Sequence, residues 1–442
     1  MSEWFHRLFN HQKVAQPRRH DFGRSINANI NPQEHQLFNQ AVDSFSAGKT
    51  VEAYEYYLSS LINFNGNLSN KNVEVHYENE VLLFTLYQGS TIIHGKVTDK
   101  VFEAHAIITS NELMNVAIKR HILARNDQLT YARFYIHSDN LAVKIYLDNT
   151  TMTPQKIFYP LRELALNADY EKEYLHYHFK QVRLVDTEHL QPISNDELRI
   201  KYEAMQRWIT DCQKELTQLP SNDNISTVSF TLLSLLFQID YLLVPHKKIM
   251  QELFEKINSY FTDDERLVEQ KNDELQHFVE TLKALSFEEF IPNFYKAKYT
   301  FSPMEHTTTE ELNQFIEASL EKFRWFKQHR YEHVASTISR YIPFYILYNY
   351  GIHPSYRALL HLLVEIQHSD FFVALGYKAM YDTNEQRFEK NSIITHIEST
   401  ISPYQEQFPH LEAFGSELNY TTMEEFSHSF YIQLKNLDYT EL

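Results

Sequence analysis

Residues 50–170 constrain the fold most, because two hydrophobic periodicities alternate there in a fixed order. Helical spacing gives way to three strand-like runs, which are followed by a helix, a two-stranded hairpin and another helix. The remaining chain has mostly helical spacing, and only 8 glycines and 13 prolines occur among 442 residues, which fits long helices and short turns. We therefore predict an α+β domain followed by a large all-α domain.

Pattern and composition divide the chain into four segments. Residues 1–30 form a basic amphipathic arm, and residues 31–170 combine a helical hairpin with the α+β domain. Residues 171–193 form a linker, and residues 194–442 form an all-α domain. The hairpin, over residues 34–64, has the spacing of one tetratricopeptide unit. Because stacked repeats need about three units, we expect this single unit to pack on the neighbouring sheet.

The first strands and the helix after them are predicted from local signals. Runs rich in Val, Ile, Phe and Tyr predict strands at residues 73–77, 81–87 and 101–109. Thr109 and Glu112 then have the spacing of a capping box, in which a hydroxyl and a carboxylate bind free backbone amides at a helix start. We expect that helix to continue to about Arg125.

Residues 131–148 predict a β-hairpin whose two-residue turn is Asp139–Asn140. With Ser138 opposite Leu141, the apolar pairs on one face are Ile136 with Val143, Phe134 with Ile145 and Ala132 with Leu147. The other face holds the candidate residues for binding a partner through charge and aromatic contact, namely Arg133, Tyr135, Lys144 and Tyr146. The alternative is that a helix of the same chain packs on this face.

A helix follows the hairpin, with Thr153 and Pro154 at its start and an apolar stripe of Ile157, Leu161, Leu164, Ala165 and Ala168. This order of elements resembles the type III secretion chaperone fold, and the hairpin and last helix resemble the bacterial YbjN-like family that shares that fold. The residues that carry the resemblance are 131–136 (YARFYI), 143–148 (VKIYLD) and 161–165 (LRELA). The resemblance transfers no catalytic residue. It implies an acidic protein, with a homodimer as one option, that holds an extended segment of a partner polypeptide.

The C-terminal half is predicted to be a bundle of helices. Ser194 and Glu197 mark one helix start, and the apolar residues after it step by four and three, from Leu198 through Tyr202, Met205, Ile209 and Cys212 to Leu216. Cys212 is expected to be a buried, unreactive thiol. Residues 230–244 are too short and too often interrupted to span a bilayer, so we expect a buried helix. Further helices are expected near residues 225–243, 246–260, 264–285, 309–328, 331–349, 355–380, 385–400 and 422–437.

Charge and cysteine content restrict the partners and the compartment. The net charge of −17 repels phosphate backbones, which argues against nucleic acid as a main partner. One cysteine allows neither an internal disulfide nor a thiolate metal cage, and it indicates a reducing, cytoplasmic location. The sequence shows neither a phosphate loop nor a dinucleotide fingerprint, so we expect no cofactor.

Two groups of histidines could bind a metal. His329-Arg330-Tyr331-Glu332-His333 matches the His-x-x-Glu-His pattern, in which His329 and His333, one helical turn apart, would share a zinc ion. Chance explains such a match readily in a chain with 23 histidines, and polar residues on a helix surface are the favoured interpretation. His176 and His178 could bind a metal together with His189 or a carboxylate, or could equally be polar surface.

These observations favour a non-catalytic, cytoplasmic bacterial adaptor or chaperone-like protein that binds a partner polypeptide through its α+β domain. The runner-up is a zinc-dependent hydrolase that uses His329 and His333. A third hypothesis is a structural subunit of a larger assembly, with the N-terminal arm as its docking peptide. The adaptor hypothesis requires that one face of the predicted sheet remain open to a second chain.

Overall fold

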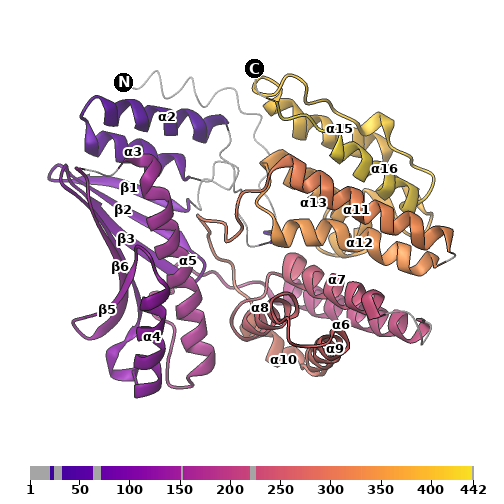
Figure 1. Ribbon diagram of the computed structural model, residues 1–442, viewed down its shortest axis with the longest axis horizontal. Coiled ribbons are helices and arrows are strands. Elements are labelled where there is room, and N and C mark those ends of the chain that lie inside the picture. Colours follow the sequence, from indigo (N-terminus) through magenta and orange to yellow (C-terminus); the bar gives the residue numbers. More distant parts are fainter. Residues whose placement is uncertain are drawn as a thin grey trace.

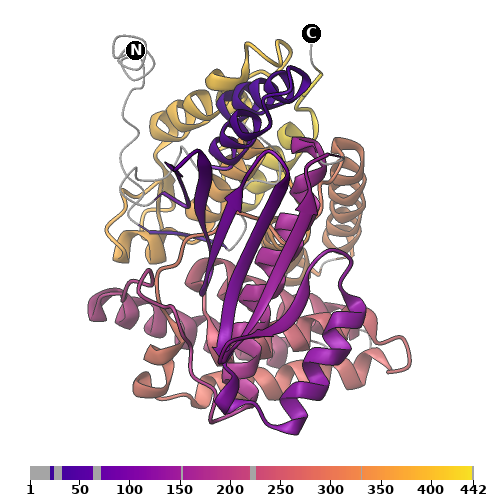
Figure 2. The ribbon, with the colours of Figure 1, turned by 90° about the vertical axis from the view of Figure 1, so that its left-hand side faces the viewer.

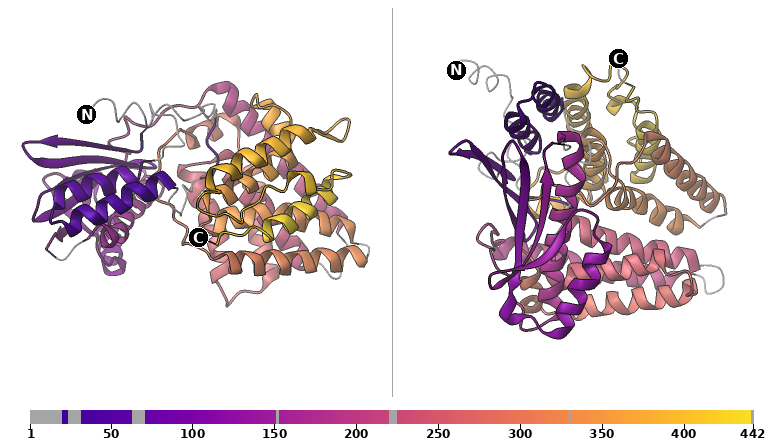
Figure 3. Two further views of the ribbon diagram at one scale, coloured as in Figure 1. Left: turned by 90° about the horizontal axis from the view of Figure 1, so that it is seen from above. Right: turned by 60° about the vertical axis from the view of Figure 1, so that its left-hand side comes forward.

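The computed structural model describes residues 20–23, 32–62, 71–150, 153–219, 225–329 and 331–440. A sheet with its helices lies beside a large all-helical region, which confirms the predicted α+β domain followed by an all-α domain (Figure 1). Seen from above, the two parts stand side by side (Figure 3). Most of the N-terminal arm lies outside the described residues, but Phe22 packs on Phe372 of the helical region, with ring centroids 5.0 Å apart.

The helical hairpin forms as predicted and packs on the sheet. Helices α2 (Pro32–Ser46) and α3 (Thr50–Ser60) are joined by a turn in which Gly48 has a φ of +75°, a conformation that glycine adopts without strain. Tyr54 and Tyr57 of α3 are fully buried, and the Tyr54 ring lies 5.2 Å from that of Phe102 in the sheet. The single hairpin therefore covers its apolar side with the neighbouring strands.

The sheet has six antiparallel strands in the order β1-β2-β3-β4-β6-β5. Their bounds are β1 (Val73–Glu78), β2 (Val81–Gln88), β3 (Thr91–Val97), β4 (Val101–Ser110), β5 (Arg133–His137) and β6 (Asn140–Asp148). The sequence did not predict β3, because His94, Gly95 and Lys96 interrupt its apolar pattern. Gly95 is required there: a Cβ atom would lie 2.1 Å from Cζ of Phe84, whose ring enters the core.

Two local predictions were wrong. Thr109 is a buried residue of β4 and caps no helix; helix α4 (Val116–Gln128) begins later, where Asn115 accepts a hydrogen bond of 2.9 Å from the Ile118 amide. The hairpin turn is Ser138–Asp139, so Phe134 pairs with Val143 in place of Ile145. Asn140 leaves the turn because it pairs with Ser110 of β4. A register shift of two residues keeps every side chain on its predicted face.

Helix α5 (Pro154–His178) is the longest helix of the described residues, and it packs on the inner face of the sheet. Its predicted stripe is fully buried: Ile157, Leu161, Leu164, Ala165 and Ala168. The helix continues to His178, so residues 171–178, expected to start a linker, are helical. On its other side α5 contacts α8 of the helical region, which places this helix between the two parts (Figure 1).

The helical region contains α6 (Asn195–Gln218), α7 (Ile225–Leu243), α8 (Lys247–Thr262), α9 (Val268–Ala284), α10 (Phe287–Phe290), α11 (Thr309–Gln328), α12 (Glu332–Asn349), α13 (Pro354–Gln367), α14 (Ser369–Ala374), α15 (Lys390–Ile401) and α16 (Met423–Lys435). Residues 355–380 do not form one helix, because the chain bends at His368 between α13 and α14. Part of the expected helix at 385–400 is instead a small hairpin, β7 (Tyr381–Asp382) and β8 (Arg387–Phe388).

The predictions for α6 and α7 are confirmed. Ser194 caps α6, and Leu198, Met205, Ile209 and Cys212 of the predicted seam are buried. Burial raises the pKa of the Cys212 thiol to about 12, which disfavours the reactive thiolate. Among the described helices, α7 alone is long and apolar enough to cross a membrane, and 72% of that apolar window is buried inside the protein.

A later segment of the chain returns to the sheet and joins the two hydrophobic cores. The Gly89 amide donates to the Lys298 carbonyl over 2.8 Å, and Gln88 exchanges hydrogen bonds with the backbone of Phe301, at 2.9 and 3.2 Å. The Phe301 ring belongs to the core beneath the sheet, whereas Phe294 before it and Leu312 after it belong to the core of the helical region. The sheet core is therefore completed by a residue far along the sequence.

Charged side chains in the middle of α5 hold different elements around it. Glu173 accepts hydrogen bonds from the Lys247 amide, at 2.9 Å, and from the Tyr295 hydroxyl, both in the helical region. Lys172 donates to the Ser90 carbonyl over 2.8 Å. Asp169 accepts from the Ser90 amide and hydroxyl, at 2.7 and 2.9 Å. Burial, and then the nearby Glu173, raise the pKa of Asp169 from 3.8 to about 7.

The raised pKa of Asp169 predicts a pH-dependent loss of stability. Between pH 4 and 7 the folded chain retains a proton on Asp169 that the unfolded chain has released, so this contribution to the free energy of unfolding falls as the pH rises. Asp169→Asn keeps the acceptor for Ser90 and removes the ionisation. We expect the variant to gain roughly 2 kcal/mol over the wild type between pH 5 and pH 8, measured by urea unfolding. Parallel pH curves for the two proteins would contradict the assignment, and Asp273→Asn, at an exposed helical position, is the control.

Candidate protein-docking face

One face of the six-stranded sheet is open to solvent. Helices α3 and α5 pack on the other face, whereas the strands lie in front of the helices when the molecule is viewed toward the open face (Figure 2). Side chains of β2 alternate strictly between buried and partly exposed, as expected for a sheet covered on one side. No described helix lies over the open face, so the arrangement that the adaptor hypothesis requires is present.

The strand register identifies the residues of the open face, because side chains directly opposite each other on antiparallel strands share a face. One row across the sheet consists of His76, Leu83, Lys96, Glu103 and Tyr146. The next row consists of Glu74, Thr85, His94, His105, Lys144 and Arg133. At one end the face is closed, since Lys298 lies over the Tyr87 ring at 4.3 Å from its centroid.

All four predicted binding residues lie together at the β5–β6 side of this face, and we call them the β6 patch: Arg133, Tyr135, Lys144 and Tyr146. The side chain of Tyr146 is 62% exposed. The Lys144 ammonium lies 4.6 Å from the centroid of the Tyr135 ring, a cation–π arrangement. Arg133 is exposed and donates to the carbonyls of Leu129 and Ala132. Their role in binding remains a prediction.

Neighbouring carboxylates do not neutralise the β6 patch. Glu103, next to Tyr146, forms an ion pair of 2.6 Å with Lys96. Asp148, at the end of β6, accepts a hydrogen bond of 2.8 Å from the Thr150 amide. The positive charges of Arg133 and Lys144 therefore face solvent in a chain whose net charge is −17. This local excess of positive charge attracts an acidic ligand.

The open face also holds histidines, of which His76, His94 and His105 were not predicted from the sequence. His76, His94, His105 and His137 all lie on it, and the rings of His94 and His105 are 6.1 Å apart. Burial, and then His94, lower the pKa of His105. His94 could not be placed because β3 was not predicted as a strand. The alternation along β1 and β4, which were predicted, was the signal for His76 and His105.

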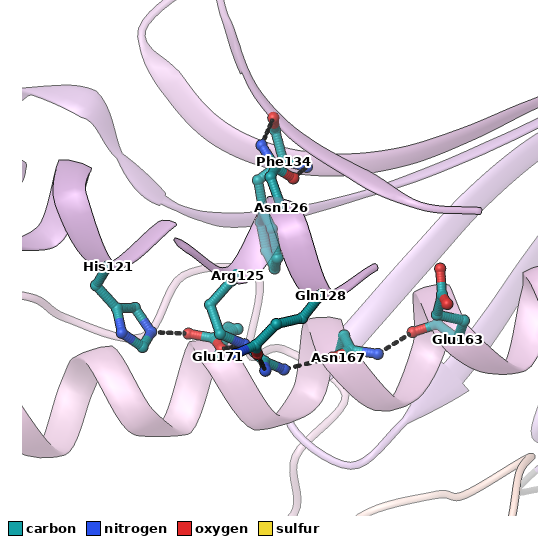
Figure 4. Close-up of polar contacts among 8 residues, drawn as sticks. All are labelled: His121, Arg125, Asn126, Gln128, Phe134, Glu163, Asn167 and Glu171. Atoms are coloured by element: carbon teal, nitrogen blue, oxygen red, sulfur yellow. Dashed lines mark hydrogen bonds and ion pairs between the residues drawn. The ribbon is translucent and has the colours of Figure 1, made fainter. Parts of the chain in front are cut away.

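The outer edge of the sheet at β5 is closed by side chains of α4 and α5. Asn126 donates to the Phe134 carbonyl over 2.9 Å and accepts from the Phe134 amide over 2.7 Å, as a partner strand would (Figure 4). Glu163 accepts hydrogen bonds from the amides of residues 130–132. Because these backbone groups are satisfied, an additional strand cannot pair with β5 at these residues.

A buried carboxylate fixes α4 in the position from which Asn126 reaches β5. Glu171 of α5 is fully buried and accepts hydrogen bonds from His121, at 2.7 Å, and from Arg125 (Figure 4). Arg125 also donates to Asn167 over 2.6 Å. The guanidinium and imidazole together satisfy both carboxylate oxygens, which a buried carboxylate requires.

The proposed zinc motif does not lie on one helix. Helix α11 ends at Gln328 and α12 begins at Glu332, so His329 and His333 are separated by a break in the helix. His329 stacks on Trp325, with ring centroids 4.1 Å apart; the side chains of Glu332 and His333 lie outside the described residues. The prediction that His329 and His333 lie one helical turn apart is therefore wrong.

The other histidine group is also dispersed. His176 contacts the Val182 carbonyl at 3.0 Å, His178 lies 3.5 Å from Glu255, and His189 contacts the Gly89 carbonyl at 2.9 Å. Among the described side chains, no three His, Cys, Asp or Glu residues are grouped as metal ligands.

Comparisons with known proteins identify no family for this chain. No family model matches the sequence, and no curated protein matches it. Among solved structures, the chain is similar to one in the crystal structure of the ExsC–ExsE complex, with 10% identity over 33% of this chain and 96% of that chain, and a TM-score of 0.17. A TM-score this low supports no inference about function.

The role of Asn126 at the sheet edge can be tested by Asn126→Ala. Loss of two hydrogen bonds should lower the free energy of unfolding by about 1–2 kcal/mol and should speed hydrogen exchange at the Phe134 amide. Asn258→Ala removes an exposed helical asparagine and is the matched control. Unchanged exchange at Phe134 would show that Asn126 does not protect this edge.

Proposed function

We propose that this protein is a non-catalytic, cytoplasmic bacterial adaptor that holds an extended segment of a partner polypeptide on the open face of its sheet. The observation that carries the proposal is a six-stranded sheet with helices on one face and exposed aromatic and cationic side chains on the other. An exposed tyrosine with a cation beside it is typical of protein interfaces, where Tyr and Arg are enriched.

The chemistry of the β6 patch specifies the partner segment. Arg133 and Lys144 favour carboxylates, and the exposed ring of Tyr146 favours an apolar or aromatic side chain. Because the β5 edge is closed by Asn126 and Glu163, the partner contacts side chains of the face and does not extend the sheet at β5. We therefore propose an acidic segment that contains at least one large apolar residue.

We further propose that the α+β domain is related to the type III secretion chaperone fold and to the YbjN-like family. The order of elements from α3 to α5 supports this relation, with β3 as one strand more than the sequence predicted. The hairpin β5–β6 and the start of α5 contain the sequence segments on which the resemblance rests. Under this proposal the helical region is an addition to the chaperone-like domain and provides a second docking surface.

Single substitutions in the β6 patch should weaken partner binding without unfolding the protein. Lys144→Glu reverses the charge that attracts the acidic segment, and Tyr146→Ala removes the exposed ring. Each should weaken binding by about tenfold or more, whereas the free energy of unfolding should change by less than about 1 kcal/mol, since both side chains are exposed. Partners recovered by affinity purification from native lysate identify the ligand for titration.

The control is a lysine–aromatic pair elsewhere on the surface. Lys390 lies 4.9 Å from the centroid of the Tyr420 ring, so Lys390→Glu makes the same chemical change in the helical region. It should bind the partner as the wild type does. Recovery of one partner in equal amounts by wild type and Lys144→Glu would overturn the proposed site.

A further inference from the structure

The helical region contains a polar cavity that the open face of the sheet does not use. Its volume is about 280 Å³, and it lies among α6, α7, α12 and the bend between α13 and α14. Trp208 and Phe371 form an aromatic wall, with their ring centroids 5.1 Å apart. Ser234, Gln238, Arg340 and His368 contribute polar groups, so this cavity can hold a small ligand with specific hydrogen bonds.

Two buried donors in the cavity have no partner among the described residues: Nε of Arg340 and Nε2 of His368. Burial, and then Arg340, lower the pKa of His368 to about 3, so its ring is neutral at physiological pH. Nε2 of Gln238 lies 3.4 Å from Nδ1 of His368 and donates to it. The ring proton is therefore on Nε2, which becomes a donor. An unpaired buried donor costs about 1–3 kcal/mol, so a ligand acceptor that reached either nitrogen would remove this cost.

The charges around the cavity select the kind of acceptor. Nη2 of Arg340 is already paired with Glu215. Asp211 and Asp370 lie at the exposed rim of the cavity. Arg207 is a further cation at this rim. Because carboxylates outnumber arginines here, a dianion such as phosphate is repelled, whereas a ligand with one carboxylate and one ammonium group matches both sets of charges.

We propose that this cavity binds a small zwitterion of the amino-acid type. The ligand carboxylate accepts from Arg340 Nε and His368 Nε2, and its ammonium group faces Asp211 and Asp370. Its side chain lies against Trp208. The bend at His368 between α13 and α14 serves this site, because it turns the imidazole into the cavity while Ser369 stays bound to the Tyr381 carbonyl. This site is independent of the proposed docking face.

The test is a titration of the purified full-length chain with each of the common free amino acids. Binding is measured as a change in the fluorescence of Trp208. At least one amino acid should give a saturable change that is lost in Trp208→Phe. Arg340→Lys keeps the charge beside Glu215 but removes the Nε donor, and it should weaken binding about tenfold or more. Arg324→Lys is the matched control, because Arg324 also pairs with a glutamate, Glu317, at 2.9 Å. The Arg324→Lys variant should bind the amino acid with the affinity of the wild type.

Further ligands and one further variant make the proposal falsifiable. Carboxylic acids without the amine, amines without the carboxylate, and inorganic phosphate should all bind at least about tenfold more weakly than the amino acid. Asp370→Asn, at an exposed position that does not endanger the fold, should weaken binding of the amino acid and leave binding of the amine-free acid unchanged. Absence of binding by every amino acid at millimolar concentration, equal binding of phosphate, or equal affinity in Arg340→Lys would each overturn the proposal.

Discussion

Burial of charge on α5 is the constraint on which the rest of this structure depends. Glu171, Lys172 and Glu173 are at most 1% exposed, and removing such groups from water costs several kcal/mol each unless every charge is paired. Each charge is paired with a different element: α4 for Glu171, the β2–β3 turn for Lys172, and the start of α8 for Glu173. A shift of α5 toward one partner would leave the others unpaired, so these contacts fix the helix in position.

The position of α5 in turn determines which face of the sheet is free. The β2–β3 turn is held against α5 so closely that a Cβ atom on Gly89 would lie 2.1 Å from the Asp169 carboxylate, and Gly89 has a φ of +54°. Glycine is the residue that tolerates both conditions. One face is held against α5 and the hairpin α2–α3, so the tyrosines, lysines and histidines of the opposite face contact no helix in the part of the chain that the structure describes. The open face therefore follows from the packing of α5 on the opposite face.

The face of the strand or helix on which each side chain lies could be predicted well from the sequence. The hairpin β5–β6 was assigned a wrong turn, yet its four candidate residues lie on the predicted face, because a shift of two residues leaves the alternation unchanged. The stripe of α5 and the seam of α6 were predicted for the same reason. Where two signals competed, local reasoning failed: Thr109 and Glu112 have a capping spacing, but pairing of β4 with β6 draws Thr109 into the sheet.

Features fixed by distant contacts could not be predicted. Strand β3 depends on Gly95, which makes room for the Phe84 ring of the neighbouring strand β2. The break at His368 is marked by no proline or glycine at that position. The cavity beside His368 gathers residues from five helices, which lie between residues 195 and 374 of the sequence. His94 of the open face was missed together with strand β3, on which it lies. In each of these cases the determining partner lies on another element, so no local window contains the signal.

The return of Phe301 to the sheet core also has a consequence for biosynthesis. The hydrogen bonds of Gln88 with the backbone at 300–301 join residues 212 or more positions apart in the chain. A nascent polypeptide that has emerged only through α5 therefore still exposes part of the apolar core beneath the sheet. Closing so long a loop is slow compared with forming the local hairpins. The first domain is therefore completed only after much of the second domain has been synthesised.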